Sequence, residues 1–178
     1  NIHFSYNHSR VINGIDHRFG RGSFSAIIGP NGSGKSTLLR LMNRILRLRE
    51  GEILIEGRNI NEMSIREISE KIAYVPQFHY SVFPATVFDT VLLGRNPFIR
   101  WSPGNNDRII VTEILAKLHL DDIALKHINQ PSGGQRQEVF IASALAQQPT
   151  IILLDEPTSS LDIRHQHEVM DLLSELSR

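Results

Sequence analysis

The sequence contains no cysteine, so disulfide bridges and thiolate metal sites are excluded, and a reducing compartment, the cytosol, is expected. Neither sign of charge is in excess, because 19 basic residues balance 19 acidic ones. The composition therefore does not indicate binding to nucleic acid or anionic membranes through overall charge. No apolar run approaches the roughly 18 residues of a membrane-spanning helix. One domain of 178 residues is expected, and local sites must carry its function.

Both ends of the sequence look like the inside of a longer chain. The first residue is Asn1 rather than a methionine. At the other end, the amphipathic pattern of Val169, Leu172, Leu173 and Leu176 is still running when the sequence stops at Arg178. We therefore expect a fragment of a longer protein.

Strand-like and helix-like patterns alternate along the chain, which predicts an α/β fold. Strands are expected at 2–6, 25–28, 51–57, 72–75 and 150–154. The last of these is all apolar after Thr150, which is typical of a parallel sheet covered on both faces. Helices are expected at 38–46, from Ser64 with Glu67, from Thr86 with Asp89, around 110–118, and from Ser132 to Ala146. This last helix should stop by Gln148, because the residue before a proline is pushed out of the helical region.

Aromatic and proline residues interrupt helical patterns, rather than strand patterns, between residues 77 and 127. We interpret this region, extended to residue 148, as an inserted α-helical subdomain. The predicted catalytic core then consists of 1–76 and 149–178, and the whole chain forms one domain.

A glycine-rich loop lies between the expected strand at 25–28 and the helix at 38–46. It matches the phosphate-binding pattern G-x-x-x-x-G-K-S, in which backbone N–H groups and the start of the helix hold an anion. Lys35 can reach the β and γ phosphates, and the Ser36 hydroxyl suits Mg²⁺. The alternative is a plain glycine turn. The residues predicted to bind the nucleotide are Gly29, Pro30, Asn31, Gly32, Ser33, Gly34, Lys35, Ser36 and Thr37.

Asp155 and Glu156 follow the expected strand at 150–154. A carboxylate at the end of a buried strand needs compensation for its desolvation, which Mg²⁺ at Asp155 would supply. Glu156 would then lie beside the γ phosphate, where it could orient and deprotonate water. The alternative is an acidic pair that caps the next helix.

The sequence SGGQ at 132–135 begins a helix 23 residues before Asp155. It closely resembles the signature motif of ATP-binding-cassette (ABC) ATPases. The resemblance implies a P-loop NTPase (RecA-like) core with a mostly parallel sheet, N-terminal antiparallel β elements and the helical subdomain. It also implies that two copies face each other head to tail, so that each signature completes the other copy's ATP site. The signature residues are Ser132, Gly133, Gly134 and Gln135; an ordinary helix cap is the alternative.

Three further positions resemble ABC motifs. Tyr6 is similar to the aromatic residue that stacks on adenine, although a core-facing strand residue is the alternative. Gln77 in YVPQ resembles the glutamine that touches Mg²⁺ or the attacking water. Asp162 in SSLD resembles the aspartate near the dimer interface. The resemblance therefore implies that Ser36, Gln77 and Asp155 bind the metal. It also implies that Glu156 and Gln77 are the catalytic residues.

The sequence VFDTVLLGRNPFIRW in the subdomain is similar to the ATPase subunits of importers for iron complexes, siderophores, haem and cobalamin. This resemblance implies transmembrane permease partners, a peripheral place on the cytoplasmic face of the membrane, and no nucleic acid. Phe78, Tyr80 and Phe83 would then form part of the surface that receives the permease, or else plain subdomain core.

Several features depart from the family pattern. Pro131 stands where members usually have leucine, and Glu138 and Ser143 stand where many have arginine. The family's later histidine, which contacts the γ phosphate, lies beyond this sequence, and His165 does not replace it. All eight histidines are interpreted as surface or core residues. We therefore predict that these 178 residues alone bind MgATP weakly and hydrolyse it poorly.

Two other functions compete with the importer. One is a soluble ABC ATPase that acts on ribosomes or DNA, and the other is a nucleotide-binding regulatory module without turnover. Ser132 lies only 97 positions after Lys35, and no sustained heptads lie between them, which argues against the coiled-coil chromosome proteins. Glu156 argues against the regulatory module.

Overall fold

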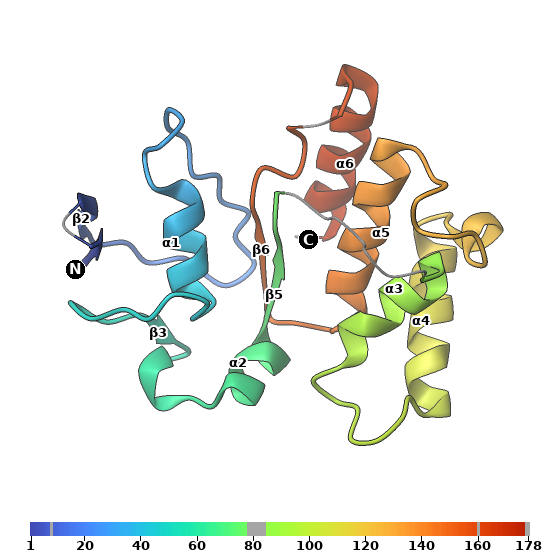
Figure 1. The fold of residues 1–178 in the computed structure, drawn as a ribbon, viewed down its shortest axis with the longest axis horizontal. Coiled ribbons are helices and arrows are strands. Elements are labelled where there is room, and N and C mark those ends of the chain that lie inside the picture. Colours follow the sequence, from blue (N-terminus) through green and yellow to red (C-terminus); the bar gives the residue numbers. More distant parts are fainter. Residues whose placement is uncertain (8, 78–84, 160, 177–178) are drawn as a thin grey trace. The chain divides into compact units, whose positions relative to one another are not determined.

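The computed structural model describes residues 1–7, 9–77, 85–159 and 161–176. The chain forms two compact units, which are described separately. Unit 1 consists of Asn1–Ile68 and Leu172–Arg178, and unit 2 consists of Ser69–Asp171. Figure 1 shows the elements of each unit along the colour ramp from blue to red.

Unit 1 begins with two antiparallel strands, β1 (Ile2–Tyr6) and β2 (Ser9–Ile15), which confirm the strand predicted at 2–6. Two further short strands, β3 (Leu54–Ile55) and β4 (Arg58–Asn59), form a second antiparallel pair and precede the 3₁₀ helix η1 (Ile60–Glu62). The strand predicted at 51–57 is therefore present but shorter. Helix α1 (Lys35–Met42) packs on β1 and β2 through a common core of Ile2, Ile12, Leu38, Leu41 and Leu48.

The strand predicted at 25–28 is wrong. Within the described residues, this segment pairs with no other strand, and Ile28 is 92% exposed. A strand is stabilised by hydrogen bonds and side-chain pairs with a neighbouring strand. An apolar run without such a neighbour does not form one.

Helix α2 (Ile65–Lys71) begins at the predicted capping box. The Glu67 backbone N–H donates to Ser64 Oγ at 3.1 Å, and the Ser64 backbone N–H donates to Glu67 Oε2 at 2.7 Å. These bonds and the one from Arg58 favour the ionised carboxylate, and they lower the pKa of Glu67 to about 2.

Unit 2 contains the parallel strand pair expected of an α/β core, β5 (Ile72–Val75) and β6 (Ile151–Leu154). The register runs from Ile72 opposite Ile151 to Val75 opposite Leu154. Helix α5 (Gly133–Ala146) packs on this pair through Phe140 and Ala144. Among the four residues of β6, only Leu153 is fully buried, so β6 is less covered than its apolar sequence predicts.

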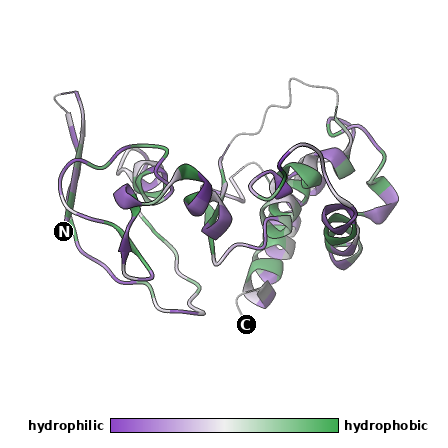
Figure 2. Ribbon diagram, turned by 90° about the horizontal axis from the view of Figure 1, so that it is seen from below, coloured by the Kyte–Doolittle hydropathy of each residue, from purple (hydrophilic) through white to green (hydrophobic). Residues whose placement is uncertain are grey.

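The predicted helical subdomain contains α3 (Val87–Leu92), η2 (Leu93–Arg95), α4 (Asn105–Lys117), η3 (Asp121–Ile123) and α5. The helices carry hydrophobic and hydrophilic residues on different sides (Figure 2), and their apolar sides form one core. The helix starts predicted at Thr86 and Ser132 are confirmed, and the structure shows a capping box at each. Helix α5 ends at Ala146, and Gln148 takes a left-handed φ of 54° before Pro149. The buried core residues are Val87, Val91, Val111, Leu115, Leu120, Ile123, Ile128, Val139, Ala142 and Ala146.

Arg95 is a buried ion that joins three parts of unit 2. Its Nε donates to Asp107 Oδ1 at 3.0 Å, and Nη1 donates to the carbonyl oxygen of Ala146 at 2.9 Å and to Gln148 Oε1 at 3.2 Å. Asp107 also accepts from the backbone N–H of Gly104 at the start of α4. This backbone bond, together with Arg95, lowers the pKa of Asp107.

Helix α6 (Ile163–Leu176) follows the segment after β6. Val169 and Leu173 are buried, in agreement with the amphipathic pattern in the sequence. No helix in the described part of the chain has the length and apolar character to cross a membrane.

Candidate functional site

The glycine loop of unit 1 turns sharply into α1. Gly32 and Gly34 have left-handed φ values of 80° and 93°, and Gly34 is the N-cap of α1. A Cβ on Gly34 would lie 3.0 Å from side-chain atoms of Val11 and of Ile12, so the loop packs closely on β2. Glycine is required here both by the backbone angle and by the close approach.

Lys35 folds back over the loop from the first position of α1. Its Nζ donates to the carbonyl oxygens of Gly29 and Pro30 at 3.0 and 3.1 Å. The ammonium group is therefore held at the start of a helix whose positive end and first N–H groups favour an anion. Thr37 is buried in the same turn. These features make the loop a candidate anion site within unit 1, and its binding of phosphate stays a prediction.

Tyr6 ends β1, and its side chain is 41% exposed. The ring packs edge-on against Phe4, with 4.9 Å between the ring centroids. An exposed aromatic ring leaves a face for a planar ligand. The stacking of Tyr6 on adenine stays a prediction.

Asp155 lies at the carboxyl end of β6 in unit 2 and is only 2% exposed. Its backbone N–H donates to the carbonyl oxygen of Val75, which continues the parallel pairing. The Tyr74 hydroxyl donates to Asp155 Oδ2 at 3.0 Å. This hydrogen bond offsets part of the free-energy cost of burying the carboxylate.

Gln77 and Glu156 follow the carboxyl ends of β5 and β6. Gln77 Nε2 donates to Glu156 Oε2 at 2.5 Å, so two residues 79 positions apart in sequence meet. Glu156 has a left-handed φ of 50°, which is uncommon for residues other than glycine. The structure thus brings together three predicted site residues: Gln77, Asp155 and Glu156.

The predicted signature residues start α5. Ser132 Oγ accepts from the Gln135 backbone N–H, and Gln135 Oε1 accepts from the Ser132 backbone N–H, each at 3.2 Å. Gly133 is exposed, and a Cβ there would meet no heavy atom within 4 Å. Arg136 donates to the carbonyl oxygens of Asn129 and Pro131 and so fixes the turn before the helix. Pro131 is buried and is tolerated before the helix.

Asp162 caps α6. Its Oδ1 accepts from the His165 backbone N–H at 3.0 Å, and His165 Nδ1 lies 2.8 Å from the same oxygen. The preceding turn is held by Gln166, whose Nε2 donates to the carbonyl oxygens of Thr158 and Leu161. Gln166 therefore holds two backbone carbonyls close to Asp162 in sequence.

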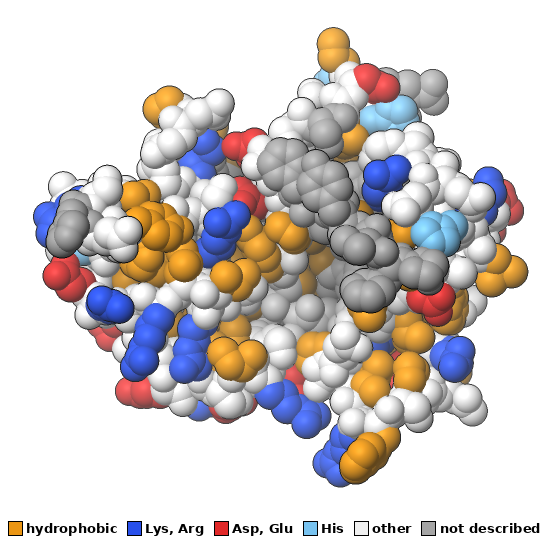
Figure 3. Space-filling model, in the orientation of Figure 1, with side chains coloured by type: hydrophobic (Ala, Val, Ile, Leu, Met, Phe, Trp, Pro, Cys, Tyr) orange, Lys and Arg blue, Asp and Glu red, His pale blue; other side chains and the backbone are white. Residues whose placement is uncertain are grey.

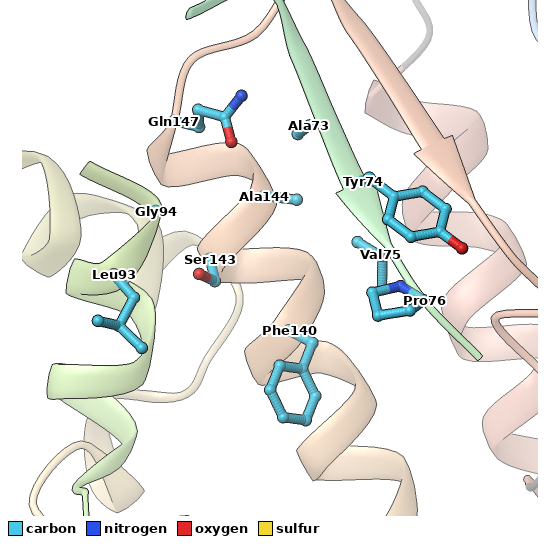
Figure 4. Close-up of a pocket in the computed structure, with 10 residues that line it drawn as sticks. All are labelled: Ala73, Tyr74, Val75, Pro76, Leu93, Gly94, Phe140, Ser143, Ala144 and Gln147. Carbon is cyan, nitrogen blue, oxygen red and sulfur yellow. The ribbon is translucent and has the colours of Figure 1, made fainter. Parts of the chain in front are cut away.

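A cavity of about 220 Å³ lies in unit 2 between β5, η2 and α5 (Figure 4). Phe140, Ser143 and Ala144 of α5 face Leu93 and Gly94 of η2 on one side and β5 on the other. Pro76, just before Gln77, also lines the cavity. The predicted permease-facing residues Phe78, Tyr80 and Phe83 lie outside the described residues.

The prediction from sequence gave no role to three residues that the structure places in these contacts. They are Tyr74, which bonds to Asp155, Arg95, which organises the subdomain, and His165, which bonds to Asp162. Tyr74 stands three residues before Gln77 in the quoted YVPQ motif, but nothing local shows that its hydroxyl reaches β6. For Arg95, the only local sign was a single charged residue in the otherwise uncharged sequence LLGRNP.

Comparison with known proteins identifies the class. The ABC transporter family matches residues 12–159. MJ0089 of Methanocaldococcus jannaschii, an uncharacterised ABC transporter ATP-binding protein, is 43% identical over 177 residues, which are 99% of this chain and 69% of that protein. FpuC of Bacillus anthracis, a petrobactin import ATP-binding protein, is 42% identical over 158 residues, which are 88% of this chain and 58% of that protein.

Two solved structures extend the comparison. A metal-chelate type ABC transporter in an inward-facing conformation superposes with a TM-score of 0.85 at 36% identity, over 99% of this chain and 66% of that one. The dimeric cassette MJ0796 gives a TM-score of 0.84 at 32% identity, over 99% of this chain and 81% of that one.

The chain is therefore an α/β ATP-binding domain and belongs to the ABC transporter family. It spans between 40% and 69% of the length of the curated relatives that it matches.

Proposed function

We propose that the chain binds and hydrolyses MgATP as the peripheral subunit that powers an ABC importer at the cytoplasmic face of the membrane. The observation that carries this proposal is the cluster at the ends of β5 and β6. There a buried aspartate, Asp155, stands next to Glu156, whose carboxylate is held by Gln77. The glycine loop, which ends at the α1 N-cap and is bonded by Lys35, supports the same activity.

ATP binding is assigned to the loop, with Lys35 and the α1 N-terminus on the phosphates and Tyr6 on the adenine. The donor set fits Mg²⁺, because the Ser36 hydroxyl, the Asp155 carboxylate and the Gln77 amide oxygen are all hard oxygen ligands. Gln77 donates to Glu156 through its nitrogen, and its amide oxygen is the atom that would contact Mg²⁺. When bound, Mg²⁺ would neutralise charge on the phosphates.

Hydrolysis is assigned to Glu156. A carboxylate held by Gln77 is positioned to accept a proton from water while the water oxygen attacks the γ phosphorus and ADP leaves. Electrostatic support for the departing charge comes from Lys35 and the helix N-terminus.

A second copy of the chain completes each site in this proposal. The capped helix start at Ser132, with exposed Gly133 and Gln135, is an anion-binding end that needs a nucleotide from another copy. Asp162 would lie near the same interface. The solved dimer of MJ0796, a cassette 32% identical to this chain, supports such pairing.

The transported compound is proposed to be an iron chelate, haem or cobalamin. Support comes from the petrobactin import protein and the metal-chelate type transporter among the similar proteins. Permease subunits would contact the segment after Gln77, and the cavity beside Pro76 lies at its start.

Co-purification of the complete protein from membranes tests the proposal. We expect a polytopic permease to accompany the protein in mild detergent and to be lost after substitution of cavity-lining Leu93 by Glu, with exposed Leu125→Glu as the matched control. Recovery of ribosomes or DNA in place of a permease would overturn the importer.

A further inference from the structure

The two glycines of the signature differ in what surrounds them. A Cβ on Gly133 would enter open space. A Cβ on Gly134 would come within 2.4 Å of Cδ2 and 2.8 Å of Cγ of His165, which lies on α6. Gly134 is buried, so its missing side chain makes room for an imidazole of its own chain.

The same imidazole reaches Asp162. A carboxylate only accepts hydrogen bonds, so His165 Nδ1 carries the proton and donates it to Asp162 Oδ1 across 2.8 Å. The Asp162 side chain is 67% exposed and that of His165 is 33% exposed, so a ring packed on α5 holds a carboxylate that faces outward. Both contacts lie within unit 2.

Gln166, the next residue, acts on a different part of the turn. Its amide holds the backbone carbonyls of Thr158 and Leu161. Gln166 thus holds two backbone carbonyls, whereas the Asp162 side chain is held by His165, through both its backbone N–H and its ring.

We propose that His165 is a positioning residue that ties Asp162 to the start of the signature helix through Gly134. Gly133 faces the partner's nucleotide, and Gly134 accommodates the ring. Movement of the signature helix then carries Asp162 with it. This inference rests on the proposed function, because it assigns a role in the interface between two copies.

A double-mutant cycle tests the contact. Gly134→Ala places a methyl group against the ring, and His165→Ala removes the ring. Coupled residues in contact change an equilibrium by roughly two- to 150-fold beyond the sum of the single effects. We expect the double variant to be as stable to urea as His165→Ala alone. Purely additive losses would overturn the contact without reference to ATP.

A second measurement tests the positioning role in the complete protein. With Glu156→Gln as background, His165→Asn keeps a donor for Asp162 and should retain ATP-dependent dimers. His165→Phe keeps a ring and should weaken them about tenfold, the loss expected for a charge-assisted hydrogen bond. His167→Ala is the matched control and should have no effect.

Nucleotide binding to the monomer, read by a fluorescent ATP analogue, should be unchanged in all these variants. Equal dimerisation of the Asn and Phe variants would overturn the positioning role. Absence of ATP-dependent dimers in the Glu156→Gln parent would instead contradict the proposed function. In that case the urea cycle still decides whether the ring packs on Gly134.

Discussion

The two units of this chain differ in charge and in the predicted site residues that they carry. Unit 1 carries 11 basic and 7 acidic residues, and unit 2 carries 8 basic and 12 acidic residues. Lys and Arg side chains are prominent on the visible face of unit 1 (Figure 3). The glycine loop belongs to the basic unit, whereas Asp155 and Glu156 belong to the acidic one.

The difference extends to how each half-site is held. The loop in unit 1 is shaped by backbone angles at Gly32 and Gly34 and by contact with β2. The carboxylates in unit 2 depend on buried strands and on side-chain bonds from Tyr74 and Gln77. In the proposed function, phosphate binding would therefore depend on the main chain and positive charge, and water activation would depend on a packed acidic cluster.

Substitution of Glu156 by glutamine should give the largest effect on turnover. We expect ATP hydrolysis by the complete protein to fall by about 10²–10⁴-fold, because the proton acceptor is lost. Nucleotide binding should be retained, since unit 1 is unchanged. Phosphate release measures turnover, and Glu113→Gln, an exposed glutamate of α4, is the control. Unchanged turnover would remove Glu156 from the mechanism.

Replacement of Lys35 by alanine probes the basic unit. Loss of a charged hydrogen-bond donor should weaken ATP binding by roughly 10- to 150-fold, which corresponds to about 1.5–3 kcal/mol. Equilibrium titration with a fluorescent nucleotide measures the affinity. Arg47→Ala removes an exposed cation of the same unit and should leave the affinity unchanged. Equal losses in both variants would mean that net charge, rather than the loop, captures the phosphates.

Asp107→Asn should destabilise unit 2. It breaks the pair with buried Arg95, and an uncompensated buried charge costs about 3–5 kcal/mol of unfolding free energy. Urea unfolding followed by circular dichroism gives this value. In unit 1, Arg58→Ala breaks the exposed pair with Glu67 and should have little effect. A similar small effect of both substitutions would contradict the structural role of Arg95.

The smallest expected effect is the loss, at acid pH, of the contribution of the Glu67 capping box to the free energy of unfolding. The folded pKa of Glu67 is about 2, below the ordinary value of 4.5, so its contribution is complete above pH 4.5 and is lost as the pH falls toward 2. The difference in unfolding free energy between the parent and Glu67→Gln, measured by urea titration, should therefore shrink as the pH falls through that range. A difference that stays constant with pH would contradict the ionised cap.

Much of the fold could be predicted from local signals. The capping boxes at Ser64, Thr86 and Ser132 and the apolar runs of β5 and β6 are recognisable within a few residues. The segment 25–28 was predicted wrongly because a strand depends on a distant neighbour. The prediction that the 178 residues alone hydrolyse ATP poorly stays open.

The candidate site could be predicted as a set of residues but not as a set of contacts. Motif spacing identified Gln77 and Glu156 separately, and the bond between them depends on the parallel register of β5 and β6. Tyr74 and Arg95 bond to partners that are far away in sequence, and His165 packs against Gly134 of another helix. No pattern within a window of residues contains that information.

Cross-linking between two copies tests the central claim most directly. The chain has no cysteine, so Asn31→Cys in the glycine loop and Ser132→Cys at the signature introduce a unique pair. In the complete Glu156→Gln protein, a short bismaleimide should give covalent dimers with MgATP and monomers without it. Dimers that form equally without ATP, or no dimers with it, would contradict a nucleotide held between the loop of one copy and the signature of another.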